Sequence, residues 1–242
     1  MKPATGLSLA LLLLLGWGAS TLGLLSTDLA QWPWWLLGFA VLLRTLLQTG
    51  LFIVGHDAMH GVLVPRHPRW NHALGACALG LYAGLAYGEC RQQHQRHHRC
   101  TASRHDPDFH PDPAAGPGRW YLRFMAGYLS PGQMGRLLGW WGALLLLSWP
   151  ANPGSGANLL LFCTLPLLLS SLQLFLFGTY LPHRVQRSPH GATAPASLDW
   201  PAWLSLLACF HFGYHREHHE HPELAWFELP SARRQRRQLA RL

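Results

Sequence analysis

Residues 159–178 read LLLFCTLPLLLSSLQLFLFG, a run of twenty residues that contains no charged side chain. A helix of about this length spans the ~30 Å hydrocarbon core of a bilayer. Blocks of the same apolar character cover roughly residues 6–26, 33–55 and 136–150, and the quoted run belongs to a fourth block at 158–179. The sequence therefore predicts an all-α integral membrane protein with four transmembrane helices.

The polar residues are concentrated between these blocks. Charged residues make up only 12% of the 242 residues, and most of the sixteen histidines and nineteen basic residues lie in the connecting segments. No linker-like stretch divides the chain, so we expect a single domain over residues 1–242. The net charge of +8 raises the alternative of nucleic-acid binding, but no recognisable nucleic-acid module accompanies it. We therefore expect a membrane protein with no nucleic-acid partner.

The distribution of basic residues predicts which side of the membrane each connection faces. The connections at 27–32 and 151–157 contain no Lys or Arg, whereas seventeen of the nineteen basic residues lie in 66–136 and 184–241. Cytoplasmic segments carry the excess of Lys and Arg, so the latter regions should form a cytoplasmic cap. The Gly- and Ala-rich block at 72–88 must then enter and leave on the same side, as a short re-entrant or interfacial hairpin.

Two further features concern the compartment. Residues 2–20 resemble a signal peptide, but the apolar run continues to about Leu25, which favours a retained first span over a cleaved leader. The five cysteines are odd in number and scattered, without a CxxC pair, so we expect free thiols in a reducing compartment.

Three histidine boxes are expected on the basic side of the membrane: HDAMH at 56–60, HQRHH at 94–98 and HREHH at 215–219. On a helix, residues i and i+4 share a face, so each box directs its imidazoles to one side. The boxes supply eight candidate ligands: His56, His60, His94, His97, His98, His215, His218 and His219. A lone histidine is usually a solvated or core residue, but three spaced boxes on one side of a membrane indicate metal binding.

Eight nitrogen donors exceed the four that one tetrahedral zinc needs, and they fit two metals with four or five ligands each. The metalloprotease signature HExxH is absent, because HREHH places its Glu one position too late. The pattern therefore disfavours peptide hydrolysis. A non-catalytic metal transporter or sensor remains an alternative, although its histidines would be expected along the spans rather than on one side.

The order HxxxH, HxxHH and HxxHH between membrane spans resembles the integral-membrane di-iron desaturase and hydroxylase superfamily. The words GHDAMHG (55–61), DPDFH (106–110), FGTYLPHR (177–184) and CFHFGYHREHHEHP (209–222) resemble the bacterial and cyanobacterial β-carotene ketolases. This resemblance implies an enzyme with two iron ions and dioxygen as co-substrate, which converts carbon 4 of a β-ionone ring to a ketone by two successive hydroxylations. Alternatives within the superfamily are a carotene 3-hydroxylase and an acyl-lipid desaturase.

The resemblance also implies partners and further site residues. The carotenoid would come from the lipid phase, electrons from a ferredoxin-like or other donor, and the location would be a bacterial or cyanobacterial inner or thylakoid membrane. His183 matches a position that often supplies one more ligand in the superfamily. Asp108 and His110 match a ketolase word and are expected either to form a carboxylate–histidine pair that orients a ligand or to lie in a Pro-bounded turn. Glu217 and Glu220 are expected to accept hydrogen bonds from ligand imidazoles or to face solvent.

Other polar residues prompt structural expectations. Arg44 and Gln48 lie four apart in the second span, so they should form a polar stripe facing the bundle or, for Arg44, reach an interface. Asp199 is expected to cap an interfacial helix that delivers the third box, and the tail RRQRRQLARL to be solvated or to meet anionic lipid. An apolar channel should hold the carotenoid. Its candidate lining residues are Phe109, Tyr180, Phe210, Phe212 and Tyr214.

Overall fold

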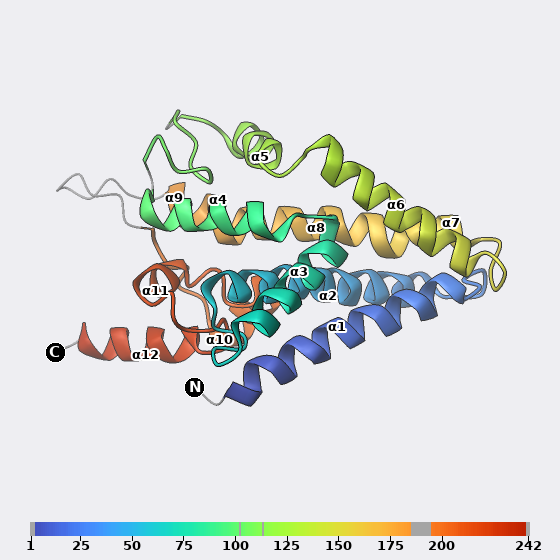
Figure 1. The fold of residues 1–242 in the computed structure, drawn as a ribbon, viewed down its shortest axis with the longest axis horizontal. Coiled ribbons are helices and arrows are strands. Elements are labelled where there is room, and N and C mark those ends of the chain that lie inside the picture. The colour runs from blue at the N-terminus through green and yellow to red at the C-terminus, as the bar shows by residue number, and fades with distance from the viewer. Residues whose placement is uncertain (1–2, 102, 113, 185–194, 241–242) are drawn as a thin grey trace.

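In the computed structural model, residues 3–101, 103–112, 114–184 and 195–240 are described, and within these ranges the regular structure is helical. The long apolar helices run along one axis of the molecule (Figure 1). The elements are α1 (Pro3–Ser26), α2 (Trp34–His60), α3 (Pro68–Ala83), α4 (Tyr87–Arg99), α5 (Pro117–Ala126), α6 (Pro131–Ser148), α7 (Ser155–Leu159), η1 (Leu160–Thr164), α8 (Leu165–Leu174), η2 (Phe175–Tyr180), α9 (Leu181–Arg184), α10 (Ala202–Cys209), α11 (His215–Glu220) and α12 (Leu229–Leu239).

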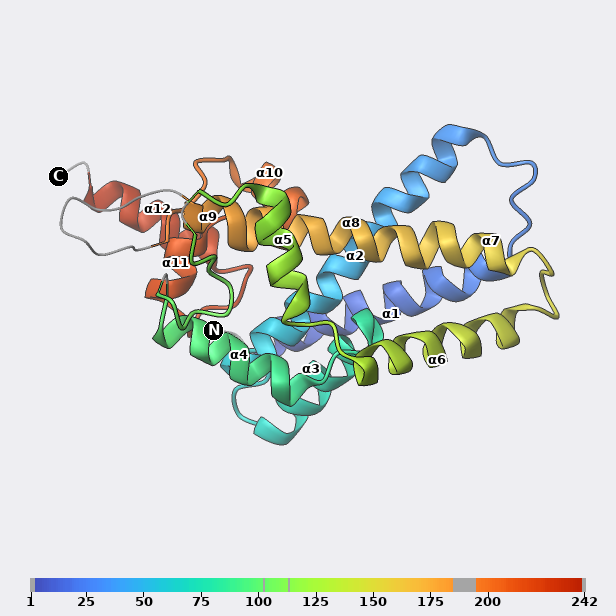
Figure 2. The same ribbon diagram turned by 90° about the horizontal axis from the view of Figure 1, so that it is seen from above.

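Three helical stretches in the described part of the chain are long and apolar enough to cross a bilayer: Ala4–Ser26, Trp34–His60 and Ser155–Arg184. Three of the four predicted blocks therefore correspond to candidate spans. The predicted block at 136–150 becomes α6, which begins at Pro131 and is not among these candidates. Its first turns carry polar Gln133 and Arg136, which shorten the apolar run. Figure 2 shows α6 along the bundle, whereas α5 crosses it.

The hairpin predicted at 72–88 is longer than expected: α3 covers most of that block, and α4, which runs from Tyr87 to Arg99, returns the chain to the end of α2. Gly84 ends α3 at a φ of 67°, a left-handed conformation that glycine adopts without strain. Arg136 Nε donates to the Gly84 carbonyl at 2.7 Å, and the Gln133 amide donates to the Ala83 carbonyl. Gly75 of α3 packs closely on α2, since a Cβ at Gly75 would lie 2.5 Å from the Ala58 Cβ. These contacts hold the turn of the hairpin against α6 and the middle of α3 against the end of α2.

The α-helix of the third candidate span is interrupted at two places. The segments η1 and η2 are π-helical, and each is followed by a proline, Pro166 and Pro182. Pro166 has no N–H to donate to the Phe162 carbonyl four residues earlier. The side chain of Arg44, which is 0% exposed, supplies a donor instead, with its Nε 3.0 Å from the Phe162 oxygen. Arg44 thus lies inside the bundle rather than at an interface.

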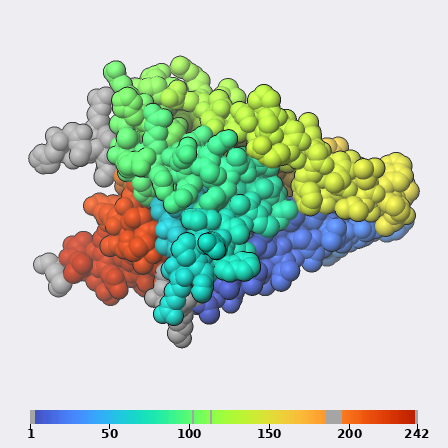
Figure 3. Space-filling model, viewed as in Figure 1, coloured from blue at the N-terminus to red at the C-terminus, as the bar shows by residue number. Residues whose placement is uncertain are grey.

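The C-terminal helices and α4 are gathered at one end of the molecule, and α6, α7 and the α1–α2 connection reach the other (Figure 3). One expectation about this end was wrong. The N-cap of α10 is Pro201, and Asp199 instead accepts a hydrogen bond from Arg233 NH2 at 3.0 Å. The described part of the tail is mostly exposed, as expected, but Arg233 of α12 is 6% exposed and packs over the Tyr214 ring.

Candidate metal centre

The first box lies on the last turns of α2. His56 and His60 are i and i+4, and the helix ends one residue later at Gly61, whose φ is 77°. Carbonyls near a helix end lack intrahelical partners. The Ala58 carbonyl accepts from Asn71 Nδ2 and from the Tyr87 hydroxyl, both at 2.8 Å. The end of α2 is thereby fixed against α3 and α4.

The second box is part of α4, and His94, His97 and His98 lie on successive turns of one face. The His94 Nε2 atom lies 2.7 Å from His60 Nε2. His97 is 1% exposed, whereas His94 and His98 are partly exposed. The hairpin of α3 and α4 therefore brings the first two boxes into direct contact.

His183 lies just after the second π-helical segment. Pro182 removes the N–H that would bond to the Gly178 carbonyl, and η2 ends two residues before Pro182. A π-helical turn changes the direction of the following side chains, and such turns are frequent at functional sites. The His183 Nε2 atom lies 2.9 Å from His215 Nε2. A long apolar helix thus delivers a single histidine to the cluster.

The third box forms the short helix α11. Between α10 and α11 the chain reverses through Phe210 and His211, whose φ values are 47° and 65°. Glu217, which is 1% exposed, accepts from Ser197, from Arg236 Nε at 2.8 Å and from Arg233 NH1 at 3.2 Å. Glu217 therefore fixes α11 to α12 instead of accepting from an imidazole. Glu220 is exposed and pairs with Arg216 at 2.7 Å.

The imidazoles meet in two groups. The first group comprises His56, His60, His94 and His218, and the second comprises His97, His183, His215 and His219. Within each group, the potential ligand atoms lie within 4.8 Å of one another. The His98 Nε2 atom is 3.1 Å from His94 Nε2 and 3.0 Å from His218 Nε2, and the His98 ring stacks on His219 with centroids 4.3 Å apart. The fold thus brings all nine predicted histidines together, with His98 between the groups.

The chemistry of these groups fits a pair of bound cations. A neutral imidazole has one donor and one acceptor nitrogen, so several Nε2 atoms facing one another cannot all be satisfied by mutual hydrogen bonds. Burial, with repulsion from neighbouring imidazoles, lowers the pKa of His94, His215 and His218 well below its usual value, and the pKa of His98 falls to about 3. These four imidazoles are therefore neutral near pH 7 and present lone pairs. Imidazole nitrogens suit iron, zinc, copper and nickel.

Two carboxylates contact the histidines from outside the groups, and neither was singled out from the sequence. Asp106 Oδ1 lies 2.8 Å from His97 Nδ1, and Asp57 Oδ1 lies 3.4 Å from His56 Nδ1. Burial lowers the pKa of His97, but the hydrogen bond to Asp106 and the charges of Asp108 and Asp106 raise it overall. The position of Asp106 in the word DPDFH was a usable signal. Asp57 lies next to His56, so only its orientation in three dimensions distinguishes it.

The two residues predicted as a carboxylate–histidine pair take separate positions. Asp108 Oδ2 lies 3.9 Å from His97 Nδ1, farther than Asp106, and burial raises the Asp108 pKa to about 6. His110 Nδ1 instead accepts from the Asp112 backbone N–H at 3.1 Å, and its ring lies against Trp120. Asp108 therefore faces the histidine cluster, while His110 lies in the Pro-containing turn.

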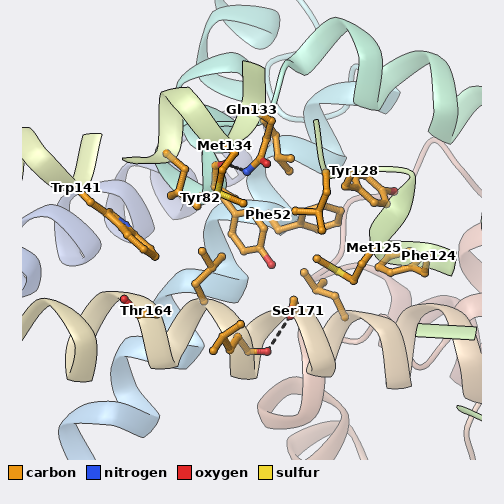
Figure 4. Close-up of a pocket in the computed structure, with 17 residues that line it drawn as sticks. Phe52, Tyr82, Phe124, Met125, Tyr128, Gln133, Met134, Trp141, Thr164 and Ser171 are labelled. Atoms are coloured by element: carbon orange, nitrogen blue, oxygen red, sulfur yellow. Dashed lines mark hydrogen bonds between the residues drawn. The ribbon is translucent and has the colours of Figure 1, made fainter. Parts of the chain in front are cut away.

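A small pocket of about 30 Å³ reaches the imidazoles of both groups. Its lining includes His56, His94, His97, His215, Asp108, Gly178, Thr179 and Phe212. Beside it, a cavity of about 270 Å³ lies between α2, α3, α5, α6 and α8 (Figure 4). Four side chains line both spaces: Phe52, Phe124, Tyr128 and Leu174. An apolar cavity therefore adjoins the histidine cluster.

The predicted aromatic lining is only partly correct. Phe212 lines the small pocket, but Tyr180 stacks on Phe175 with centroids 5.7 Å apart. The Tyr214 hydroxyl donates to the Trp200 carbonyl at 2.8 Å. The remaining two candidates also pack against aromatic rings, Phe109 on Trp120 and Phe210 on Trp226. The larger cavity takes part of its lining from α5 and α6, which the sequence did not connect with the boxes.

Comparison with known proteins agrees with this architecture. Residues 32–140 and 133–242 match the model of the family described as fatty acid desaturase. The chain is 43% identical over 198 residues to a protein named beta-carotene ketolase from Paracoccus sp. (strain N81106 / MBIC 01143), covering 78% of this chain and 76% of that protein.

Two algal relatives are longer. The chain is 38% identical over 218 residues to a beta-carotene 4-ketolase of Protosiphon botryoides, with coverage of 86% of this chain and 54% of that protein. It is 40% identical over 198 residues to a zeaxanthin 4-ketolase of Chlamydomonas reinhardtii, with coverage of 77% and 42%. The chain thus spans about half the length of these two relatives. These matches confirm the resemblance carried by the histidine words: the chain belongs to the fatty acid desaturase family and, within it, groups with the β-carotene ketolases.

Proposed function

We propose that this protein is a membrane oxygenase that converts carbon 4 of the β-ionone ring of β-carotene to a ketone, giving echinenone and canthaxanthin. The observation that carries the proposal is the apolar cavity that lies beside a pocket lined by both histidine groups and shares four lining side chains with it. The names of the relatives, β-carotene ketolase and 4-ketolase, support the choice of substrate and of carbon atom.

The nine histidines are proposed as ligands of two iron ions. His56, His60, His94, His98 and His218 would hold one ion, and His97, His183, His215 and His219 the other. Bound iron would supply the reduction of dioxygen and the oxidation of the ring carbon. Asp106 and Asp57 would fix the orientation of His97 and His56, because a carboxylate on the second ring nitrogen holds a ligand histidine in place.

The cavity is proposed to orient the substrate and to exclude water from the reacting carbon. A carotene has no charge or hydroxyl to grip, so it must be held by shape and apolar contact. The cavity lining includes the exposed side chains of Leu129, Met134 and Leu168, with 49%, 38% and 55% exposure. These residues mark an entrance between α6 and α8 that would face lipid. The ring would pass between Phe124 and Tyr128 to reach the imidazoles.

We further propose how the protein is placed in the membrane. α6 would serve as a fourth span beside the three candidate spans, in a single domain over residues 1–242. The histidine end, where the basic residues gather, would face the cytoplasm of a bacterial or cyanobacterial inner or thylakoid membrane. A ferredoxin-like or other soluble donor would deliver electrons at that end.

Pigment analysis tests the activity. Expression in a β-carotene-producing host should yield echinenone or canthaxanthin, while zeaxanthin would indicate oxidation at carbon 3 instead. Metal analysis of the purified protein should give two iron ions per chain. Metal binding without any pigment product would support a transport or sensing protein and would refute the oxygenase.

A further inference from the structure

The histidine cluster reaches the outer surface of the molecule at His98 and His219. Both side chains are partly exposed, and neither lines the small pocket, so their exposed atoms face the outside. Their rings stack with centroids 4.3 Å apart. Five other imidazoles of the cluster are buried, those of His56, His97, His183, His215 and His218. Because His98 is proposed for one ion and His219 for the other, this stacked pair places both proposed ions next to the same surface.

The surface beside this pair carries positive charge without acidic partners. Residues 90–105, which surround His98, contain four arginines and no acidic residue. Three of these arginines are exposed, Arg96 and Arg99 on α4 and Arg104 in the loop that follows. None of the three forms an ion pair with a residue in the described ranges. On α11, by contrast, the exposed Arg216 is neutralised by Glu220 at 2.7 Å. The three arginines on the α4 side define the basic edge.

The composition of the basic edge suits a soluble partner better than a lipid surface. The last turns of α4 lie at the end of the molecule opposite α7 (Figure 1). Helices that lie on lipid headgroups combine basic residues with exposed Trp, Phe or Leu. No large apolar side chain in the described residues between Trp70 and Leu122 is exposed, whereas α10 exposes Trp203 by 65%. The basic edge therefore has charge without an apolar anchor.

We propose that the basic edge is the docking surface for an acidic, one-electron iron–sulfur protein, which delivers electrons to the metal centre through the stacked pair of His98 and His219. This inference rests on the proposed function. Each hydroxylation consumes two electrons and two protons, which leave one atom of dioxygen in the ring and the other in water. The reduced iron–sulfur cluster loses one electron at each encounter, so the donor docks twice for each hydroxylation.

Repeated docking favours a small, charged surface over an apolar one. Complementary charge raises the rate of association by about 10–1,000-fold without lengthening the lifetime of the complex to the same degree. Weak complexes for electron transfer bury less than about 1,200 Å² in total. The end of one helix and the loop that follows it can supply the basic part of such a surface. Electron transfer also slows steeply with distance, and the stacked pair is the part of the cluster that this surface adjoins.

A titration measures docking without turnover. An acidic [2Fe–2S] ferredoxin in its oxidised form is added to the purified, metal-loaded protein in detergent, and the Kd is followed from low to high salt. The test variant is Arg96→Glu/Arg99→Glu, and Arg96→Lys/Arg99→Lys keeps the charge. The matched control, Arg69→Glu/Arg234→Glu, reverses the same number of charges at exposed positions on α3 and α12.

We expect binding of the wild-type protein to weaken as salt is added, because salt screens exposed charges. Charge reversal at the basic edge should raise the Kd about tenfold at low salt, and the difference should shrink at high salt. The lysine variant and the control should stay within about twofold of the wild-type Kd, because exposed charges outside the contact are screened.

Turnover then separates docking from chemistry. With reduced ferredoxin as the donor, Arg96→Glu/Arg99→Glu should raise the KM for ferredoxin and leave kcat close to that of the wild-type protein. Reduced viologen is a small cation that needs no docking surface, and with it the variant should form ketone at least as fast as the wild-type protein. A merely structural role of the two arginines would lower both rates.

The outcomes distinguish failure of this inference from failure of the proposed function. An unchanged Kd in Arg96→Glu/Arg99→Glu, or equal weakening in the control, would refute the docking surface. If the variant lost only its thermal stabilisation by phosphatidylglycerol and kept its affinity for ferredoxin, the basic edge would bind lipid headgroups instead. Absence of ketone from metal-loaded wild-type protein with reduced viologen would refute the oxygenase, because that assay does not depend on docking.

Discussion

Replacing Glu217 with alanine should destabilise the protein and release metal, although Glu217 is not a proposed ligand. Its carboxylate is 1% exposed and accepts from Arg233 and Arg236 of α12 and from Ser197. It lies on α11 among the three histidines of the third box. Loss of Glu217 would therefore free α11 from α12. Because α11 carries histidines of both groups, both groups would lose part of their support.

The loss of stability depends on how well Arg233 and Arg236 are still paired or hydrated once Glu217 is removed. Breaking a buried ion pair by removing one partner costs about 3–5 kcal/mol, because the other charge stays buried. Arg233 keeps Asp199 at 3.0 Å, and the Arg236 side chain is 36% exposed and can be hydrated. We therefore expect a loss near the lower limit, about 3 kcal/mol, which corresponds to a change of roughly 150-fold in the equilibrium.

Glu220→Ala is the matched control on the same helix. Glu220 pairs with Arg216, but both side chains are more than 40% exposed, so the loss should be about 0.5 kcal/mol or less. Thermal unfolding in detergent and metal retention against a chelator measure both variants. Glu217→Gln should be intermediate, because it keeps the shape and an acceptor oxygen without the charge. Equal stability and metal retention in Glu217→Ala and Glu220→Ala would refute the argument.

The remaining predictions concern the metal groups. His97→Ala and His218→Ala should each weaken the binding of a different ion, so metal analysis should show loss of about one ion per chain in either variant. Retention of two ions and full activity in both variants would contradict the assignment. Asp106→Asn should lower metal affinity by about 10–100-fold in a chelator titration, whereas Asp108→Asn, whose carboxylate is farther from His97, should have the smaller effect. Because the folded state holds the pKa of most cluster histidines low, the unfolded state binds more protons below about pH 6.5. Stability of the metal-free protein should therefore fall as the pH drops below that value, and a flat profile of unfolding temperature between pH 7 and pH 5 would contradict this.

Much of the site could be predicted because helical spacing is local. The i, i+4 relation that aligns His56 with His60 or His94 with His98 depends only on the helix, and the charge distribution already assigned the boxes to one side. The partner of His97 could not be derived in this way. Asp106 and Asp108 lie two residues apart in a loop, and only the turn geometry decides which of them reaches the imidazole.

Helix boundaries and burial were harder to predict where contacts between distant residues outweigh the local composition of the sequence. The apolar block was expected to begin at residue 136, but α6 begins at Pro131, and its Gln133 and Arg136 side chains bond to carbonyls of the α3–α4 turn. The basic tail has the composition of a solvated end, yet Arg233 is buried and donates to the Glu217 carboxylate, sixteen positions earlier. In both cases the hydrogen-bond acceptor lies in another element of the fold, and the hydropathy of the sequence does not indicate which residues will meet.

The contact between Arg44 and the Phe162 carbonyl makes two distant positions interdependent. An arginine in the middle of an apolar bundle is tolerable only where backbone oxygens are free to receive it, and Pro166 leaves one such oxygen free. Replacing the arginine alone would leave that oxygen without its side-chain donor. Replacing the proline alone would let a backbone N–H compete for the oxygen, but Arg44 would keep the Trp17 carbonyl and the Ser20 hydroxyl as acceptors. Engineering of this span should therefore treat Arg44 as the residue on which the proline depends.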